Sequence, residues 1–436
     1  MFAPGAGQWV AAMSDLHVKY LLVGGGLAAS AAAQAIRSID PKGAVLLVGQ
    51  EINRPYRRTA LSKTFLQRQA GREALYALPA DWYERHGVAL RTGRRVAHID
   101  TARQAATLDS GEEVSYDRAL LATGAVPRAL DVPGARLPNL FYLRAVEDAD
   151  RLHHAIDKAR HEGRAHERGR GRAVVIGGGT LGVELAVTFA ALGLAVDLAV
   201  AQDRPWHRFT GTSGGRLLTG QLQKNGVAVH VNAPALRLEG DGRVQRVVLG
   251  DGQTLPCDFA VAAVGALPNK ELLRGTPIAA GKSILVDEHC RTNVDSVYAA
   301  GDCAAVFDPR FGKHRGQAQW DEAEVTGALA GANMAGVARK YDAVGEFAAD
   351  VFGLRAHAWG EARLVDRRIV RGANGGEAPH LIEFGVAADG RVAHVFAVGV
   401  SEDDAVTLRG LVAERTPVDG NEERFKEPTS ALADLL

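Results

Sequence analysis

The feature that constrains this chain most is a pattern of short apolar strand, glycine turn and helix that occurs twice. In the first copy, residues 18–23 read Val-Lys-Tyr-Leu-Leu-Val and lead into the turn Gly-Gly-Gly-Leu-Ala-Ala at residues 24–29. An alanine-rich stretch continues to about residue 36, and another apolar run occupies residues 45–48. This order predicts a β-α-β unit.

The second copy repeats the pattern in the middle of the chain. Residues 173–176 read Ala-Val-Val-Ile, the turn Gly-Gly-Gly-Thr-Leu-Gly covers residues 177–182, and an apolar run follows at residues 196–200. Two such units in one chain predict an α/β protein with two Rossmann-like, doubly wound nucleotide-binding domains.

Each glycine turn follows a strand and opens a helix, which is the setting of a dinucleotide site. Glycine lets the backbone approach a pyrophosphate, and the free amides at the positive end of the helix then carry its charge. A turn that merely joins strand to helix is the alternative for either copy alone. The expected contacts are Gly24, Gly26, Leu27 and Ala28 in the first turn, and Gly177, Gly179, Thr180, Leu181 and Gly182 in the second.

An acidic residue about 20 positions after the glycines binds the adenosine ribose in such units. In the first unit Gln50 and Glu51 directly follow the strand, and Glu51 is the predicted ribose ligand. In the second unit the strand ends at the apolar Val200, and Asp203 stands slightly beyond it. Asp203 is either the ribose ligand or a turn residue, and both interpretations stay open.

Composition excludes several classes of function. Lys plus Arg equals Asp plus Glu, 51 against 51, so no whole-molecule field attracts nucleic acid or an anionic membrane. The three cysteines, Cys257, Cys290 and Cys303, have neither disulfide-framework nor metal-ligand spacing, and no metal site is expected. The uncharged run at residues 20–36 is interrupted by glycines and short for a bilayer, so we expect a cytoplasmic protein without a membrane span.

Further motifs resemble a known family. Residues 55–63, Pro-Tyr-Arg-Arg-Thr-Ala-Leu-Ser-Lys, resemble the P-Y-x-R-P-x-L-S-K segment of ferredoxin-reductase-type flavoproteins of the pyridine nucleotide-disulfide oxidoreductase superfamily. Residues 121–124, Leu-Ala-Thr-Gly, are similar to their A-T-G strand, and residues 297–302, Val-Tyr-Ala-Ala-Gly-Asp, to their second FAD motif. Within this family the chain most resembles the apoptosis-inducing-factor branch, and residues 261–269 and 320–334 carry that resemblance.

The resemblance implies FAD in the first unit and a nicotinamide nucleotide in the second. Lys63 would bring its ammonium to flavin N5, where reduction builds negative charge. Glu184 would pair with Lys63 beside the nicotinamide; its other interpretation is an acid favoured by the helix dipole. Asp302 would hold the ribityl chain. The other implied contacts are Arg58, Val96, Thr123, Gly124, Arg144, Gln319 and Trp320 toward FAD, and Gly265 toward the nucleotide.

Two departures from the family pattern stand out. Where the family has F-W-S-D, this chain reads Phe347-Ala348-Ala349-Asp350, so Ala348 replaces the tryptophan that covers the flavin. Unless another side chain such as Trp359 takes that place, the flavin is expected to be open on this side. Ala318-Gln319 also replaces the Glu-His of the apoptosis-inducing-factor branch.

These motifs predict an order of domains. Residues 1–16 form a disordered lead-in, residues 17–134 with 267–340 the FAD domain, residues 135–266 the NAD(P)H domain, and residues 341–436 a smaller C-terminal α+β domain. Within the last, Asp389-Gly390 signals a hairpin and Ser401 with Asp404 a helix cap. The Arg-, His- and Gly-rich residues 160–172 are expected to be a solvated linker, and the histidines there and just before it lack ligand spacing: His153, His154, His161 and His166.

The leading hypothesis is an NAD(P)H:acceptor reductase that serves a ferredoxin-like iron–sulfur protein, a quinone or a small oxidant, as a monomer or homodimer. Asp203 before Arg204 favours NADH, because the 2′-phosphate of NADPH needs cationic partners; NADPH remains the alternative. Residues 50–63 contain no cysteine, so dithiol chemistry is not expected, and Cys303 is interpreted as a small buried residue. The second hypothesis is a slow redox-sensing interaction protein resembling apoptosis-inducing factor.

Overall fold

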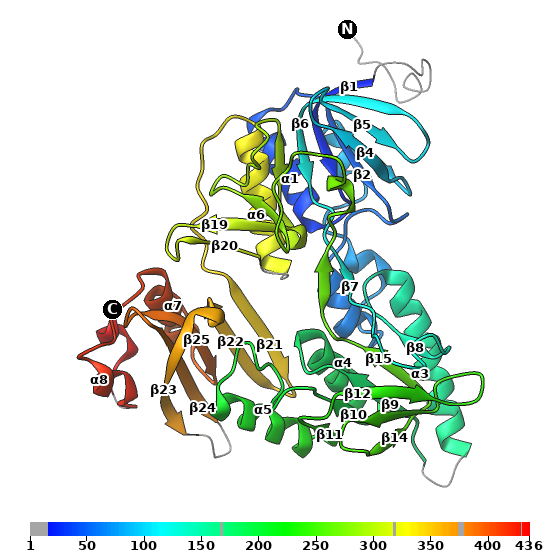
Figure 1. Ribbon diagram of the computed structural model, residues 1–436, viewed down its shortest axis with the longest axis vertical. Coiled ribbons are helices and arrows are strands. Elements are labelled where there is room, and N and C mark those ends of the chain that lie inside the picture. The colour runs from blue at the N-terminus through cyan, green and yellow to red at the C-terminus, as the bar shows by residue number, and fades with distance from the viewer. Residues whose placement is uncertain (1–15, 166–168, 317–319, 374–378, 429) are drawn as a thin grey trace. The chain divides into compact units, whose positions relative to one another are not determined.

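A computed structural model describes the chain in two compact units. The first unit contains residues up to 57, with 76–125 and 268–342; the second contains residues 58–75, 126–267 and 343–436. The described residues are 16–165, 169–316, 320–373, 379–428 and 430–436 (Figure 1). The predicted lead-in therefore lies outside them except for its last residue. The expected domain bounds stay predictions, and each unit is described by itself below.

The first unit is built on a seven-stranded sheet of order β3-β2-β1-β6-β5-β4, with β18 also paired to β6. Its parallel strands are β1 (Leu16–Val23), β2 (Val45–Gly49), β3 (Val88–Thr92), β6 (Glu113–Leu121) and β18 (Val297–Ala299). An antiparallel extension is formed by β4 (Val96–Asp100) and β5 (Ala105–Leu108). Leu21, Leu22, Leu46 and Leu47 are fully buried, as in a parallel sheet covered on both faces.

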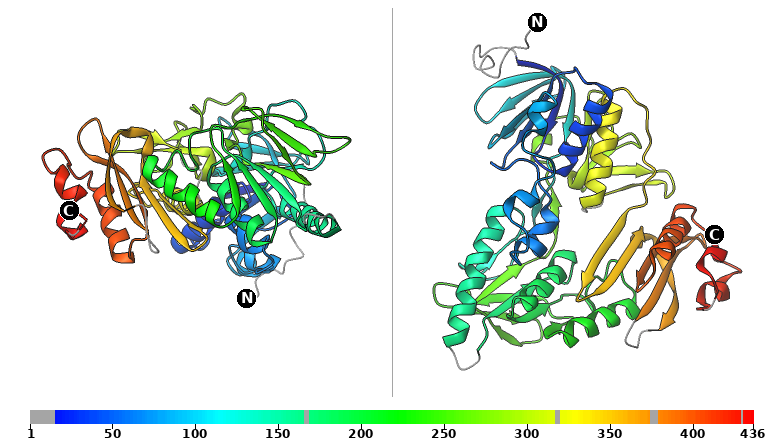
Figure 2. Two further views of the ribbon diagram at one scale, coloured as in Figure 1. Left: turned by 90° about the horizontal axis from the view of Figure 1, so that it is seen from below. Right: turned by 180° about the vertical axis from the view of Figure 1, so that it is seen from behind.

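Two helices of the first unit, α1 (Leu27–Ile39) and α6 (Trp320–Met334), lie side by side in Figures 1 and 2. Glycines make this close approach possible. A Cβ on Gly327 would lie 2.2 Å from the carbonyl oxygen of Ala28, and one on Gly331 would lie 2.4 Å from that of Ala32. The first glycine turn, at the start of α1, is thereby held against a second helix.

The second unit carries the other doubly wound sheet, of order β11-β10-β9-β15-β8 and parallel throughout. Its strands are β8 (Leu140–Phe141), β9 (Arg172–Ile176), β10 (Ala195–Ala199), β11 (Val227–His230) and β15 (Phe259–Ala262). Its helices are α3 (Val146–Ala165), α4 (Thr180–Ala191) and α5 (Thr212–Lys224). The two α/β sheets confirm the predicted fold class.

The predicted linker at residues 160–172 is wrong over its first part, because α3 continues to Ala165. Leu152, Ile156 and Ala159 recur at helical spacing and are buried, so an apolar face carries the helix past residue 160. Near this end of the helix, His161 is exposed. Among the predicted histidines, His153 binds the carbonyl oxygen of Phe65 at 3.0 Å, and His166 lies outside the described residues.

The C-terminal part of the second unit is an antiparallel sheet of order β21-β22-β25-β24-β23, packed against the helix α7 (Figure 2). Its elements are β21 (Glu346–Val351), β22 (Leu354–Gly360), β23 (Val365–Ala373), β24 (His380–Ala387), β25 (Val392–Val398), α7 (Glu402–Ala413) and α8 (Glu422–Lys426). The hairpin at Asp389-Gly390 is confirmed, with Gly390 at φ 72°. The cap is confirmed too, since the Ser401 hydroxyl oxygen accepts from the Asp404 amide at 3.1 Å.

Candidate functional site

The glycine turn of the second unit is shaped by contacts that exclude a side chain. Gly177 has φ 120°, and a Cβ there would lie 2.3 Å from the carbonyl oxygen of Ala263. A Cβ on Gly182 would lie 1.8 Å from the carbonyl oxygen of Gly177, so the first turn of α4 closes tightly on the loop before it. Gly179 precedes the helix in an extended conformation, and no side chain caps it. The amides of the α4 start are therefore available to an anion, which fits a pyrophosphate.

The turn of the first unit has the same construction. Gly24 has φ 132°, and a Cβ there would lie 2.0 Å from the carbonyl oxygen of Ala122. Gly26 precedes α1 without a side-chain cap, and Leu27 and Ala28 are the first, buried residues of the helix. The two copies that look alike in sequence thus fold alike, and each offers backbone amides that fit one dinucleotide.

An ion pair in the second unit joins Lys63 to Glu184. The ammonium lies 2.9 Å from Oε1 of Glu184, which confirms the predicted contact. Lys63 stands in a short π-helical turn, Leu61–Phe65, with non-helical φ −123° and ψ −107°. Its side chain is 39% exposed against 10% for Glu184, so the cation can reach a ligand while the carboxylate is held inside.

Two residues that the sequence interpretation missed fix this pair. The hydroxyl of Ser62 donates to Oε2 of Glu184 at 2.6 Å, and the hydroxyl of Thr188 donates to the carbonyl oxygen of Ser62 at 2.6 Å. Glu184 and Thr188 are one helical turn apart on α4 and are both buried. Ser62 stood inside the segment that carries the family resemblance, which was the available signal; Thr188 had none.

Other predicted FAD residues of the first unit cluster at strand ends. The hydroxyl of Tyr56 donates to Oε2 of Glu51 at 2.5 Å, which orients the predicted ribose carboxylate. Thr123 donates to the carbonyl oxygen of Asn269 at 2.7 Å, just after β6. Three further positions fall on the same framework: the exposed Gln50 after β2, the buried Val96 at the start of β4, and Asp302 in the turn after β18.

The remaining predicted residues are placed as follows. In the second unit, Arg58 donates through Nη1 to the carbonyl oxygen of Arg144 at 2.8 Å. Gly265 is exposed with φ 109°, and Gly124 in the first unit has φ 69°. Gln319 lies outside the described residues, and of Trp320 only its place at the start of α6 is described.

The loop after β10 holds Asp203 with its side chain 60% exposed. Arg204 is turned back onto the protein: Nη1 contacts Asp203 at 2.5 Å, and Nε and Nη2 donate to the carbonyl oxygen of Thr210 at 3.1 and 3.0 Å. Burial lowers the pKa of His207, and neighbouring arginines lower it further, so its ring is neutral at pH 7. Arg204 is therefore engaged and His207 uncharged, whereas Arg208 on the same loop is exposed.

Cys303 is completely buried, and its Sγ lies within hydrogen-bonding distance of the carbonyl oxygens of Leu121 and Ala300, at 3.4 and 3.3 Å. Burial raises the pKa of this thiol, so no thiolate forms near neutral pH. Burial also raises the pKa of Cys257 to about 12. These environments suit structural cysteines.

Ala348 lies on β21 opposite His357, and Glu346 lies opposite Trp359, so all four side chains share one face of the sheet. Ala348 is exposed, whereas Trp359 is only 1% exposed and stacks on His357 at 5.2 Å. The pKa of Glu346 is lowered, chiefly by a hydrogen bond from His357 and also by one from Trp359. Trp359 is thus fixed by packing and by a polar contact.

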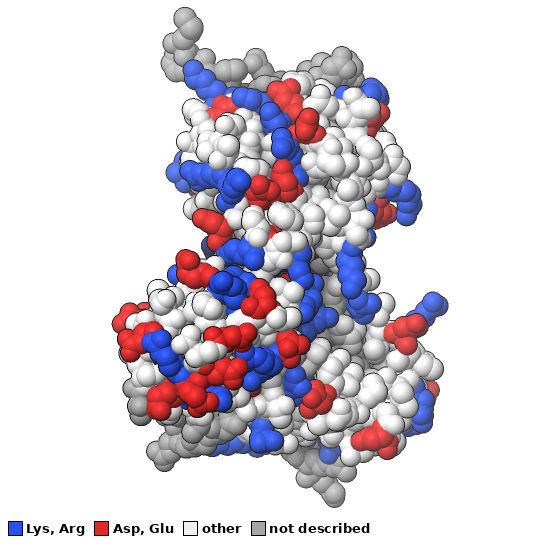
Figure 3. Space-filling model, turned by 60° about the vertical axis from the view of Figure 1, so that its left-hand side comes forward, with Lys and Arg blue, Asp and Glu red and all other residues white. Residues whose placement is uncertain are grey.

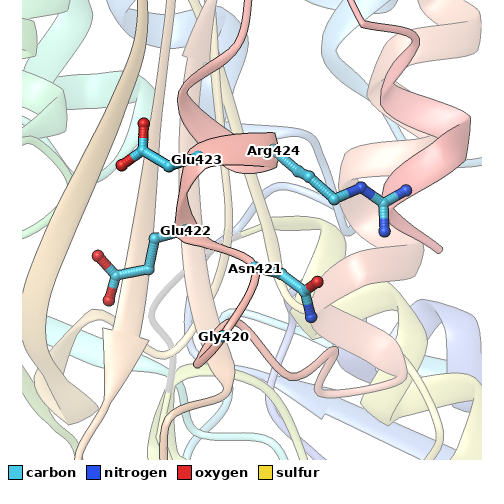
Figure 4. A pocket seen from close by; sticks show the side chains of 5 residues that line it. All are labelled: Gly420, Asn421, Glu422, Glu423 and Arg424. Carbon is cyan, nitrogen blue, oxygen red and sulfur yellow. The ribbon is translucent and has the colours of Figure 1, made fainter.

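A pocket on α8 is lined by Gly420, Asn421, Glu422, Glu423 and Arg424, and none of these is a predicted site residue (Figure 4). On the face in Figure 3, acidic and basic side chains are interspersed. Within the described residues, no group of three or more His, Cys, Asp or Glu side chains could hold a metal ion. Each described helix is too short or too polar to span a bilayer.

Comparison with known proteins gives a consistent result. The model of the pyridine nucleotide-disulphide oxidoreductase family matches residues 18–327. The ferredoxin–NAD(+) reductase component of a biphenyl dioxygenase system from Paraburkholderia xenovorans is 32% identical, over 95% of this chain and 97% of its own. A solved ferredoxin reductase from Rhodopseudomonas palustris has a TM-score of 0.86 at 28% identity, covering 95% of this chain and 99% of that one. The covalent putidaredoxin reductase–putidaredoxin complex has a TM-score of 0.87 at 26% identity, covering 96% and 98%.

Two glycine turns built for dinucleotides, an ordered Lys-Glu pair and full-length similarity all point the same way. The chain belongs to the pyridine nucleotide-disulphide oxidoreductase family, within which it is an FAD-dependent NAD(P)H oxidoreductase of the ferredoxin-reductase type.

Proposed function

We propose that this protein takes hydride from NADH onto FAD and passes the electrons to a small iron–sulfur protein. Bound FAD accepts two electrons as hydride and can release them singly, which suits a one-electron carrier. The observation that carries the proposal is the Lys63–Glu184 ion pair of 2.9 Å on a unit whose glycine turn fits a dinucleotide. Support for the partner comes from the relatives, which are named as ferredoxin reductases and as a putidaredoxin reductase in complex with putidaredoxin.

Lys63 is proposed to supply positive charge where the flavin becomes negative on reduction. Its ammonium is accessible, and Glu184 restricts its position from the buried side. Ser62 in turn holds the second oxygen of Glu184, which leaves that carboxylate little freedom to rotate. The three side chains act as one unit, in which only Lys63 is proposed to contact FAD.

Asp203 is proposed to bind the adenosine ribose of NADH. Its exposed carboxylate stands beyond β10, and it would repel a 2′-phosphate. The inward Arg204 and the neutral His207 support the same choice of nucleotide. Gly177, Gly179, Thr180, Leu181 and Gly182 are proposed to hold its pyrophosphate. FAD is proposed to be held in the first unit by Gly24, Gly26, Glu51, Thr123 and Asp302.

Steady-state turnover of the purified protein tests this function. NADH and NADPH are each combined with a panel of ferredoxins, a quinone and a dye, and the flavin content is measured alongside. We expect a yellow protein with about one FAD per chain, many turnovers per second with at least one ferredoxin, and preference for NADH. Slow turnover with every acceptor, together with an NADH-dependent change in oligomeric state, would instead indicate the redox-sensing role.

A further inference from the structure

The C-terminal sheet packs, within the second unit, against the loop that carries Asp203. This loop comprises residues 200–211, between β10 and α5. Phe347 on β21 stacks flat on Phe209, with ring centroids 4.5 Å apart and an interplanar angle of 5°. The same Phe347 meets Trp206 edge-on at 4.9 Å. Two aromatic residues of the loop are therefore packed against one side chain of another sheet, whereas surface loops are usually mobile.

Trp206 is held in an unfavourable state by this packing. It has φ 53°, a left-handed conformation that bulky residues rarely adopt, and it is only 1% exposed. Its indole nitrogen finds no hydrogen-bond partner among the described residues. Its backbone amide donates to the carbonyl oxygen of Gly178 at 2.7 Å, inside the glycine turn. The loop and the pyrophosphate turn are thus tied at a residue that only its surroundings keep in place.

Glu383 on β24 holds the far end of the loop. It is fully buried, and its carboxylate accepts hydrogen bonds from the amide of Gly211 and, at 2.8 Å, from that of Gly214. A side chain from the C-terminal sheet thereby caps α5, whose own first residues provide no cap. Arg368 on β23 lies 3.8 Å from the same carboxylate.

Three glycines at the start of α5 make room for these contacts. A Cβ on Gly211 would lie 2.7 Å from the Arg368 side chain, and one on Gly214 would lie 2.6 Å from that of Phe396. A Cβ on Gly215 would lie 2.4 Å from the Arg204 side chain, which itself binds Asp203. The position of α5 thus determines where Arg204, and with it Asp203, can lie.

We propose that Glu383 and Phe347 are positioning residues for the nicotinamide nucleotide: from the C-terminal sheet they fix the 200–211 loop, and so set the affinity for NADH and its preference over NADPH. The inference rests on the proposed ribose role of Asp203. It assigns the C-terminal sheet a part in nucleotide selection through residues that do not touch the nucleotide.

The test compares Glu383→Gln and Phe347→Leu with the control Glu361→Gln. Glu361 is a buried acid of the same sheet region, and it binds Arg363 two residues away. Glutamine keeps the shape of Glu383 but removes its charge, and leucine keeps Phe347 apolar without the stacked ring. Both variants are expected to raise the KM for NADH by roughly five- to tenfold and to narrow the NADH preference, at unchanged kcat with saturating NADH. The control should leave KM within about twofold.

A double-mutant cycle with Asp203→Ala then locates the effect. If Glu383 acts through the loop, Glu383→Gln should change KM little once Asp203 is absent. Unchanged KM in both variants, a fall in kcat alone, or full additivity with an Asp203→Ala variant that itself raises KM would overturn the inference. If Asp203→Ala leaves KM unchanged while Glu383→Gln and Phe347→Leu raise it, the ribose role of Asp203 fails and the anchoring of the loop stands. Flavin content and thermal unfolding are measured for every variant, so a misfolded one is recognised and the other carries the test.

Discussion

The Lys63 ammonium and the Glu184 carboxylate, 2.9 Å apart, are unequally buried: the lysine side chain is 39% exposed and the glutamate 10%. A charge that loses its partner is most costly where water cannot replace that partner. The more buried partner here is Glu184. Substitution of Lys63 and substitution of Glu184 should therefore lower stability by different amounts, although both should slow reduction of the flavin.

Lys63→Ala should slow reduction of the flavin by NADH by roughly 100-fold, because it removes the cation that we propose to face the developing negative charge. It should also lower stability by about 1–3 kcal/mol, since among the described residues Glu184 then keeps the Ser62 hydrogen bond alone. Glu184→Gln should slow reduction less and cost less stability. Stopped-flow reduction and thermal unfolding measure both effects; wild-type reduction rates in both variants would remove the pair from the mechanism.

Asp203→Ala should raise the KM for NADH and improve the relative use of NADPH, because it deletes the acid and releases Arg204 from its 2.5 Å contact. The change in KM should be roughly tenfold, as for loss of one charge-assisted hydrogen bond. Steady-state kinetics with both nucleotides provide the measurement. Asp241→Ala, at an exposed acid elsewhere in the unit, is the control. A wild-type preference of tenfold or more for NADPH would contradict the assignment.

Ala348→Trp should slow turnover with dyes and quinones and prolong the long-wavelength charge-transfer band of the reduced protein with NAD⁺. An added indole would stack with about 0.5–1.5 kcal/mol and restrict access to the flavin, if the family alignment at Ala348 holds. Asp350→Asn on the same strand should leave both properties unchanged. Equal turnover and an equal band in Ala348→Trp would show that the alignment is wrong there.

Cys303→Ser should be nearly silent in turnover. The raised pKa means that the thiol stays protonated from acid through neutral pH and becomes reactive only above its usual range. Accordingly, iodoacetamide should not label Cys303 in the folded protein at pH 8, whereas unfolding should expose it. Loss of activity in the serine variant, with FAD retained, would restore thiol chemistry as a hypothesis.

Gly327→Ala should destabilise the first unit and weaken FAD retention. The new Cβ would lie 2.2 Å from the carbonyl oxygen of Ala28, so α1 and α6 would have to separate. Gly220→Ala is the matched control: it too is a helical glycine, but a Cβ there meets nothing within 4 Å. The control should gain about 0.5–1 kcal/mol from helix propensity. Thermal unfolding that shifts both variants in the same direction would contradict the close packing of α1 on α6.

Much of the fold could be predicted because its signals are local. Around Gly24, and again around Gly177, the strand, the glycine turn and the helix follow one another within about thirty residues. The apolar runs on either side indicate buried parallel strands. The end of α3 could not be predicted from its polar residues, because its buried face at Ile156 and Ala159 decides how far it extends.

The site divides in the same way. Lys63 and Glu184 were found through a segment resemblance, and their contact is confirmed. Ser62 and Thr188 were missed because their roles depend on a helix distant in sequence. Glu383 carried one unused signal: an acid in the middle of a buried apolar strand needs a partner, but nothing in the strand says that the partners are amides of α5.

The stacking of Phe347 on Phe209 matters for anyone who recombines such reductases. A chimaera joined near residue 342 would inherit Phe347 and Glu383 from one parent, and the loop they hold from the other. Poor activity of such a chimaera would then be attributed to the C-terminal sheet, although its cause would be mismatched contacts between that sheet and the start of α5. Transplanting residues 200–215 together with the C-terminal sheet keeps these contacts and makes the exchange interpretable.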